Sequence, residues 1–338
     1  MTHSRTPALV AAPLAGAALV ALLTASTASA ADPTVIGQSL QPATVETALV
    51  ASIGNARTAW ATQDTSPGPG DAPVVLWTTG SSDGPRKLAT LTDAANNGVD
   101  GLEVGSAKGG VPVAFVATER AKDDARDDLR LVRLDTGAVH RIRSTYRGRE
   151  IGGVGIDRGR LYFTTHPAKT TSREHSVLWR ATLTGTTIGS AKKIRTSAPR
   201  ETWLRVLADG GRVAVESTTP VTNGGGVYAH QRWAFGTPRG TWRRTPFAIA
   251  SNGSFSPIHA AGIDGTRLIT VRDRVDGQVV TSLPLSRKDE TARITVGPDS
   301  GDLAQLVPAY LPGTGELLTR SLDASAAPAI GYTENLFP

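Results

Sequence analysis

Asp209-Gly210-Gly211-Arg212-Val213-Ala214-Val215 is a tight turn followed by a short apolar run, and the chain contains six stretches of this kind. Glycine after aspartate favours a two-residue turn between paired strands, and the β-branched residues that follow favour a strand. The other five stretches begin at Gly54, Gly109, Asp157, Asp264 and Gly313. Six copies of one local pattern indicate an internal repeat.

The repeat has a period of about fifty residues, which is the length of a four-stranded propeller blade. Equivalent positions follow one another at steps of 55, 48, 52, 55 and 49 residues. These positions are Arg57, Pro112, Arg160, Arg212, Arg267 and Glu316. The sequence therefore predicts an all-β fold, a six-bladed β-propeller of four-stranded antiparallel blades. Two β-sandwiches are the alternative, and the regular step argues against them.

Each repeat continues with further apolar runs that complete a blade. Third runs span 74–78, 129–134, 177–183, 227–235, 279–285 and 329–336, and fourth runs span 87–91, 139–143, 193–196, 241–248 and 293–296. The sixth repeat has no fourth run. We expect residues 34–40, near the N-terminus, to supply it and close the ring, because an open sheet edge favours aggregation.

The first thirty residues read as a secretory signal peptide. Arg5 precedes an apolar run from Leu9 to Leu23, and Ala28-Ser29-Ala30 is a small-x-small cleavage site. Cleavage after Ala30 would leave residues 31–338 as a single secreted domain with no membrane span. An uncleaved anchor is the alternative, although the run is short for a span.

Composition limits the chemistry that the chain can perform. There is no cysteine, which excludes disulfides, zinc thiolates and a thiol nucleophile. The net charge is +6, and Arg232-Trp233-Ala234-Phe235 with Arg239, Trp242, Arg243 and Arg244 interleaves basic and aromatic residues as a stacking platform would. Strand alternation and the arginine-rich usage of a GC-rich genome explain this equally well, so we expect no nucleic-acid partner.

Motifs for catalysis are mostly absent from the sequence. It has no His-Glu-x-x-His, no phosphate-binding loop and no EF-hand loop. His166, Glu174 and His175 fall in one loop and are interpreted as a solvated surface, with a metal site as the alternative. Leu311-Pro312-Gly313-Thr314-Gly315 matches a wall-sorting signal without the apolar stretch and basic tail that give it meaning, so it is interpreted as a turn.

Two stretches resemble a known family. Phe255-Ser256-Pro257 with Asp264-Gly265-Thr266-Arg267-Leu268 is similar to the inner-strand signature of TolB-like propellers, and residues 128–137 are similar to a strand and turn common to WD40-like and TolB-like blades. The chain departs from this pattern at Arg158, where glycine is expected, and lacks the usual Trp before the Asp-Gly turn. The resemblance implies a secreted six-bladed propeller with a general binding role.

Propeller geometry places the loops between second and third strands, and the connections between blades, on one face, which we call the loop face. The predicted loops are 64–71, 119–128, 165–176, 217–226 and 272–277, and they are long and charged. Glu119, Arg272 and Asp273 are therefore candidate ligand-binding residues. Solvent-facing spacers are the alternative.

A carboxylate precedes or begins the innermost strand in five of the six repeats. These residues are Glu46, Asp100, Glu150, Glu201 and Asp302, with Ser256 in the equivalent place of the fifth repeat. In a closed wheel they would form a ring at one mouth of the central channel. Such a ring needs a cation, for which Ca²⁺ is the best fit, or neutralisation by Arg149 and Arg200. Capping of neighbouring turns is the alternative.

Three function classes follow. The first and favoured one is an exported, monomeric, non-enzymatic propeller that binds a protein, a small molecule or a cell-envelope ligand on its loop face, with no cofactor. The second is a metal-dependent, Ca²⁺-using hydrolase or lactonase with its site in the channel. The third, a carbohydrate-binding or carbohydrate-cleaving propeller, is the weakest because aromatic residues make up only 5% of the chain. Catalytic residues and metal ligands are not identified by the sequence.

Overall fold

The structure is a computed structural model of the 338-residue chain. It describes residues 34–38, 45–52, 57–64, 73–80, 86–91, 99–118, 128–167, 175–223, 226–245, 258–274, 277–286, 292–296, 304–311, 316–321 and 329–332. Every regular element in these ranges is a β-strand. In these ranges there is also no helix that could span a bilayer. The predicted signal peptide, Phe255-Ser256-Pro257 and most of the sorting-like stretch lie outside the described residues.

The described strands form six antiparallel sheets. Sheet one holds β2 (Val45–Ser52), β3 (Arg57–Asp64), β4 (Val74–Gly80) and β5 (Arg86–Leu91). Sheet two holds β6 (Val99–Ser106), β7 (Pro112–Thr118), β8 (Asp128–Arg133) and β9 (Val139–Ile142). Sheet three holds β10 (Thr145–Tyr146), β11 (Arg149–Asp157), β12 (Arg160–His166), β13 (Val177–Thr184), β14 (Thr187–Ile188) and β15 (Lys192–Thr196).

The remaining three sheets have four strands each. Sheet four holds β16 (Thr202–Asp209), β17 (Arg212–Asn223), β18 (Gly226–Gly236) and β19 (Trp242–Arg244). Sheet five holds β20 (Ile258–Asp264), β21 (Arg267–Arg274), β22 (Gly277–Pro284) and β23 (Ala292–Val296). Sheet six holds β24 (Ala304–Leu311), β25 (Glu316–Ser321), β26 (Ala329–Tyr332) and β1 (Thr34–Gln38).

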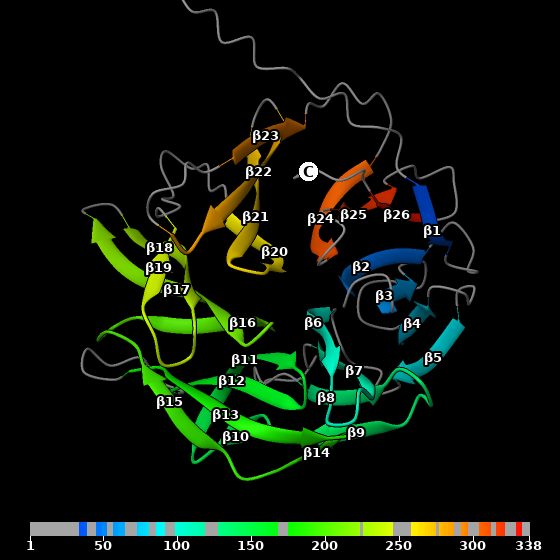
Figure 1. Cartoon of the computed structure of the whole chain (residues 1–338), viewed down its shortest axis with the longest axis horizontal. Coiled ribbons are helices and arrows are strands. Elements are labelled where there is room, and N and C mark those ends of the chain that lie inside the picture. The colour runs from blue at the N-terminus through cyan, green and yellow to red at the C-terminus, as the bar shows by residue number, and fades with distance from the viewer. Residues whose placement is uncertain are drawn as a thin grey trace, which may run out of the picture.

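The sheets are arranged around a centre, with one edge of each pointing inward (Figure 1). The innermost strands are β2, β6, β11, β16, β20 and β24, and each contacts the next around the cycle, with β24 contacting β2. On sheet six, β1 pairs with β26, so Thr34 lies opposite Tyr332 and Gln38 opposite Ala329. The first and last described strands are therefore neighbours in one sheet.

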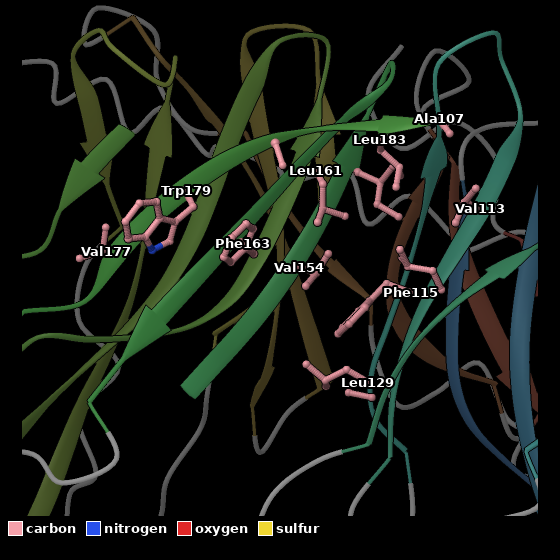
Figure 2. Close-up of a cluster of buried hydrophobic side chains, with 14 residues drawn as sticks. Ala107, Val113, Phe115, Leu129, Val154, Leu161, Phe163, Val177, Trp179 and Leu183 are labelled. Atoms are coloured by element: carbon pink, nitrogen blue, oxygen red, sulfur yellow. The ribbon is translucent and has the colours of Figure 1, made fainter. Parts of the chain in front are cut away.

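The middle strands of a sheet are buried on both faces because neighbouring sheets cover them. In β12, Leu161 and Phe163 pack towards sheet two, whereas Tyr162 packs with Trp203 and Val206 of sheet four. Figure 2 shows the first of these clusters, between sheets two and three. Burial on both faces explains why these strands read as continuous apolar runs rather than as an alternating pattern.

A threonine on the second strand accepts a hydrogen bond from a side chain on the third strand in three successive sheets. Thr62 accepts from Trp77 Nε1 at 2.8 Å, and Thr165 accepts from Trp179 Nε1 at 2.9 Å. In sheet two, Thr118 accepts from Arg130 Nη1 at 2.8 Å. The hydroxyl gives a partner to a buried donor that would otherwise destabilise the fold.

The turn after β11 shows why the repeat begins with a tight turn. Arg158 has φ 45° and Gly159 has φ 77°, so both central residues are left-handed. A Cβ on Gly159 would lie 3.0 Å from the Lys108 backbone of the neighbouring sheet. Arg158, the residue that departs from the family pattern, therefore holds a backbone conformation that glycine adopts more readily.

Two of the predicted loops are wrong. The range 217–226 is mostly ladder, because β17 continues to Asn223 and β18 begins at Gly226. The range 272–277 is also mostly ladder, with Arg272 opposite Val279 and Asp273 opposite Gln278. Polar residues suggested loops in both ranges, but in the first one threonine and valine have high strand propensity and extend the hairpin. The short strands β10 and β14 were not predicted either.

Candidate functional site

The structure places the predicted carboxylates on several sheets. Glu46 lies in β2 opposite Gln63, and Asp100 is an exposed residue of β6. Glu150 is the second residue of β11, and Glu201 immediately precedes β16. Asp302 and the loop candidate Glu119 lie outside the described residues. Arg272 and Asp273, which were predicted to lie in a loop, lie in β21.

Glu150 lies close to a histidine side chain of its own sheet. Its Oε2 lies 3.8 Å from Nδ1 of His166, which is opposite it in the ladder between β11 and β12. Arg149, one of the two arginines expected to neutralise the ring, instead donates to the carbonyl oxygen of His175. In the described part of the chain, no three His, Asp or Glu side chains are grouped so that they could hold a metal.

Glu201 is buried, with 4% of its surface exposed, and is neutralised from its own sheet. Its Oε1 lies 3.6 Å from Nη2 of Arg232 on β18, and its Oε2 accepts a hydrogen bond from the Ala198 amide. Arg200, which was expected to do this, is exposed and has φ 65°. A shared carboxylate ring with one cation therefore does not describe Glu201, and for Glu46 and Asp302 it stays a prediction.

A groove of about 1010 Å³ opens beside Glu201, between the outer strands of sheets three and four. We call it the rim groove. One wall is β15 with the connection to β16, and the other wall is β19 with the turn before it. It is lined by Arg195, Thr196, Ser197, Ala198, Glu201, Trp203, Ala234, Arg239, Gly240, Thr241, Trp242, Arg243 and Arg244.

Two indole rings and a guanidinium stack across the rim groove. The rings of Trp203 and Trp242 have centroids 6.2 Å apart with an angle of 18° between their planes. The Cζ of Arg195 lies 4.6 Å from the Trp242 centroid, which is within cation–π distance. Trp242 Nε1 donates to the Thr237 carbonyl at 2.7 Å, and Arg195 Nη1 donates to the Gly240 carbonyl at 3.3 Å. These contacts fix Arg195 in the groove wall.

The rim groove carries an excess of positive charge. Four arginines line it, and its one carboxylate, Glu201, is already paired with Arg232. Burial, and secondly repulsion by Arg244, lowers the pKa of Arg195. The same two causes lower the pKa of Arg232, while Glu201 opposes them. Within the described residues the arginines of the groove therefore repel one another, and an anion would relieve that repulsion.

Arg243, another of the four arginines that line the groove, connects the groove to sheet five. Its Nη1 donates to the carbonyl oxygens of Pro284 and Ser286, the latter at 2.7 Å. Both acceptors lie at the end of the β22 region, on the next sheet around the cycle. The wall formed by β19 is thus held from both sides.

Sequence reasoning noted several of the residues that line this groove but did not recognise them as part of a groove. It noted the basic and aromatic residues from Arg232 to Arg244 and attributed them to strand alternation. It could not find Arg195, because this residue comes from another sheet and meets Trp242 only when the two sheets pack side by side. A spacing rule within one repeat carries no signal for a contact between repeats.

A carboxyl with a raised pKa lies on an innermost strand, outside the rim groove. Burial raises the pKa of Glu103 on β6 to about 8, and the Arg205 charge on β16 opposes this shift. The residue keeps partial access to solvent. A carboxyl with this pKa is largely protonated at neutral pH, so it offers a hydrogen-bond donor rather than a charge.

Comparisons with known proteins bear on the fold. The sequence matches no family model and no curated protein. The structure is similar to an α-L-arabinanase of Penicillium chrysogenum solved with arabinobiose, at a TM-score of 0.53 and 10% identity, over 90% of this chain and 98% of that chain. It is also similar to a protein of unknown function from Dyadobacter fermentans, at a TM-score of 0.55 and 12% identity, with the same coverage.

A third similar structure is the β-propeller domain of the trilobed protease from Pyrococcus furiosus, at a TM-score of 0.47 and 8% identity, over 87% of this chain and 99% of that domain. The structural neighbours are β-propeller proteins. At these identities the similarity concerns the fold alone. Because its six described sheets follow one another around a closed cycle, the chain has an all-β fold of the β-propeller kind.

Proposed function

We propose that this protein is an exported, monomeric β-propeller of six four-stranded blades that binds a ligand without transforming it. The six sheets and the pairing of β1 with β26 support the blade count and a ring closed by the N-terminal strand. The sequence resemblance to TolB-like propellers supports the general binding role. The signal-like residues 1–30 support export.

The observation that carries the proposal is the rim groove with its stacked Trp203, Trp242 and Arg195. Its volume of about 1010 Å³ is that of a small-molecule site, and its polar groups are held by contacts to the fold. Arginine is also over-represented among groups that dominate binding energy. The site therefore has the properties of a preorganised binding site.

The hydroxyl group of Ser197, which lies close to Glu201, is held by hydrogen bonds within the fold. Ser197 Oγ accepts from the Ser176 amide at 2.9 Å and lies 2.7 Å from the Ala198 carbonyl oxygen and 2.9 Å from that of Glu201. A nucleophilic serine needs a free lone pair and a base that takes its proton. This arrangement favours binding over a hydrolytic role for the groove.

The test separates binding from the alternative, a Ca²⁺-dependent hydrolase or lactonase with its site in the channel. Purified protein would be screened by thermal shift against neutral sugars, peptides, carboxylates and phosphate esters, with Arg195→Gln as the groove variant and Arg267→Gln as an exposed control. We expect protection by one class, lost in the groove variant and kept in the control. Ester or lactone turnover that requires Ca²⁺ and disappears in Glu150→Ala would instead support the alternative.

A further inference from the structure

We propose that the rim groove binds a doubly charged tetrahedral oxyanion, the phosphate group of a phosphate monoester or inorganic sulfate, between the guanidinium groups of Arg195 and Arg244. The inference rests on the proposed function and names its ligand class. It uses two arginines that line the groove from opposite walls. Arg195 lies in β15 and Arg244 lies in β19.

The first support is the charge that the fold leaves without a carboxylate. Within the described residues, Arg195, Arg239 and Arg244 have no ion pair, and Arg243 donates only to carbonyl oxygens. Glu201 does not compensate them, because it is paired with Arg232. Several cations facing one space favour a ligand of charge −2 over a ligand of charge −1, because one dianion can neutralise two of them.

The second support is the orientation of Arg195. Its guanidinium is stacked on Trp242 and donates through Nη1 to the Gly240 carbonyl. This leaves the edge with Nε and Nη2 to bind, and that edge matches two oxygens of a carboxylate, phosphate or sulfate. Because the side chain is already fixed, ligand binding costs little of its conformational entropy.

The third support favours an oxyanion over a nucleic-acid base as the ligand. A nucleic-acid base would need a free aromatic face on which to stack. Trp242 is already covered by the guanidinium of Arg195 and stacked with Trp203, and Trp203 is buried. The groove therefore offers guanidinium edges and hydroxyls rather than ring faces.

The size of the groove indicates what carries the anion. A volume of about 1010 Å³ is far larger than one phosphate group needs. Hydroxyl groups of Thr196 and Thr241 also line it. The oxyanion that fits the groove best is thus one group of a larger polar molecule, such as a sugar phosphate.

The experiment is calorimetric titration of the whole protein with glucose 6-phosphate, glucose, inorganic sulfate and sodium chloride at matched ionic strength. We expect the phosphate ester and sulfate to bind, and glucose and chloride not to. Arg195→Gln and Arg244→Gln should each weaken binding about tenfold or more, because each removes charge-assisted hydrogen bonds. Arg267→Gln, an exposed arginine on sheet five, should bind like the parent.

A pH series distinguishes the two sources of dianion. A phosphate monoester loses its second charge below about pH 6, so its affinity should fall there, whereas sulfate binding should not. Equal binding by chloride, or unchanged affinity in Arg244→Gln, would overturn the inference. If the phosphate ester fails while another ligand class still protects the parent and not Arg195→Gln, the oxyanion is wrong and the binding function stands. If no ligand distinguishes the groove variants from the control, both are wrong.

Discussion

Arg195 of sheet three lies over the indole of Trp242 of sheet four, with 4.6 Å between its Cζ and the ring centroid. The two residues connect the outer parts of neighbouring sheets. The sheets radiate from a common centre, so they diverge towards these outer parts (Figure 1). The contact therefore fixes the width of the rim groove as well as the direction of the guanidinium.

Removing the exposed charge of Arg244 should stabilise the protein. Arg244 repels both Arg195 and Arg232, so Arg244→Gln should raise the free energy of unfolding by up to about 0.5 kcal/mol. The gain should vanish in 0.5 M salt, because screening removes repulsion between exposed charges. Urea unfolding at low and high salt measures both. A loss of stability at low salt would show that Arg244 makes a favourable contact instead.

Thr165→Val should destabilise the protein by about 1–3 kcal/mol, because it leaves the buried Trp179 Nε1–H without an acceptor. Thr165→Ser keeps the hydroxyl and is the matched control, with a smaller loss from the missing methyl group. Both are compared by urea unfolding. The double variant Thr165→Val with Trp179→Phe should lose less than the sum of the two single changes. Additive losses would mean that the hydrogen bond does not couple the two residues.

Stability should fall as pH rises from about 5 to 8 through Glu103. Its pKa in the folded protein is raised to about 8 from an ordinary 4.5, so between these values the folded state holds a proton that the unfolded state has lost. The slope is at most about 1.4 kcal/mol per pH unit. Chemical unfolding at pH 5, 6.5 and 8 measures it. Glu103→Gln should lack this fall, and an identical profile in the two proteins would disprove the assignment.

Deleting β1 should lower the stability of the whole protein in a single transition, because the ladder edge of β26 becomes exposed. A protein that starts at residue 39 would be compared by calorimetry with one that starts at Thr34. We expect a lower and still cooperative thermal midpoint for the shorter chain. An unchanged midpoint would show that β1 does not contribute to closing the structure.

The middle strands of the repeats could be predicted as continuous apolar runs because, where their burial is described, they are buried on both faces. The predicted run 177–183 corresponds to β13, Val177–Thr184, and the run that starts at Arg160 corresponds to β12, Arg160–His166. The missing fourth run of the last repeat also predicted the pairing of β1 with β26, which is present. A turn residue next to a β-branched run is a local preference, and in natural proteins such local preferences agree with the final fold.

The candidate site could not be predicted in the same way. Glu201 was identified from its place before an innermost strand. Its expected partner was the adjacent Arg200, but its partner in the structure is Arg232 on β18. Likewise, Arg272 and Asp273 looked like loop residues and lie in the β21 ladder. Which residue neutralises which charge is decided by packing between strands and sheets, and a single sequence read repeat by repeat holds no information on it.

The pairing of Thr34 with Tyr332 places two residues from opposite ends of the sequence at the same end of one ladder. A pulling force between them would load the hydrogen bonds of β1 and β26 one after another, as in opening a zip, rather than all together in shear. The pairing of β1 with β26 would therefore separate at low force. Under tension, peeling of β1 from β26 is the first event, and the other five sheets would still be folded when it occurs.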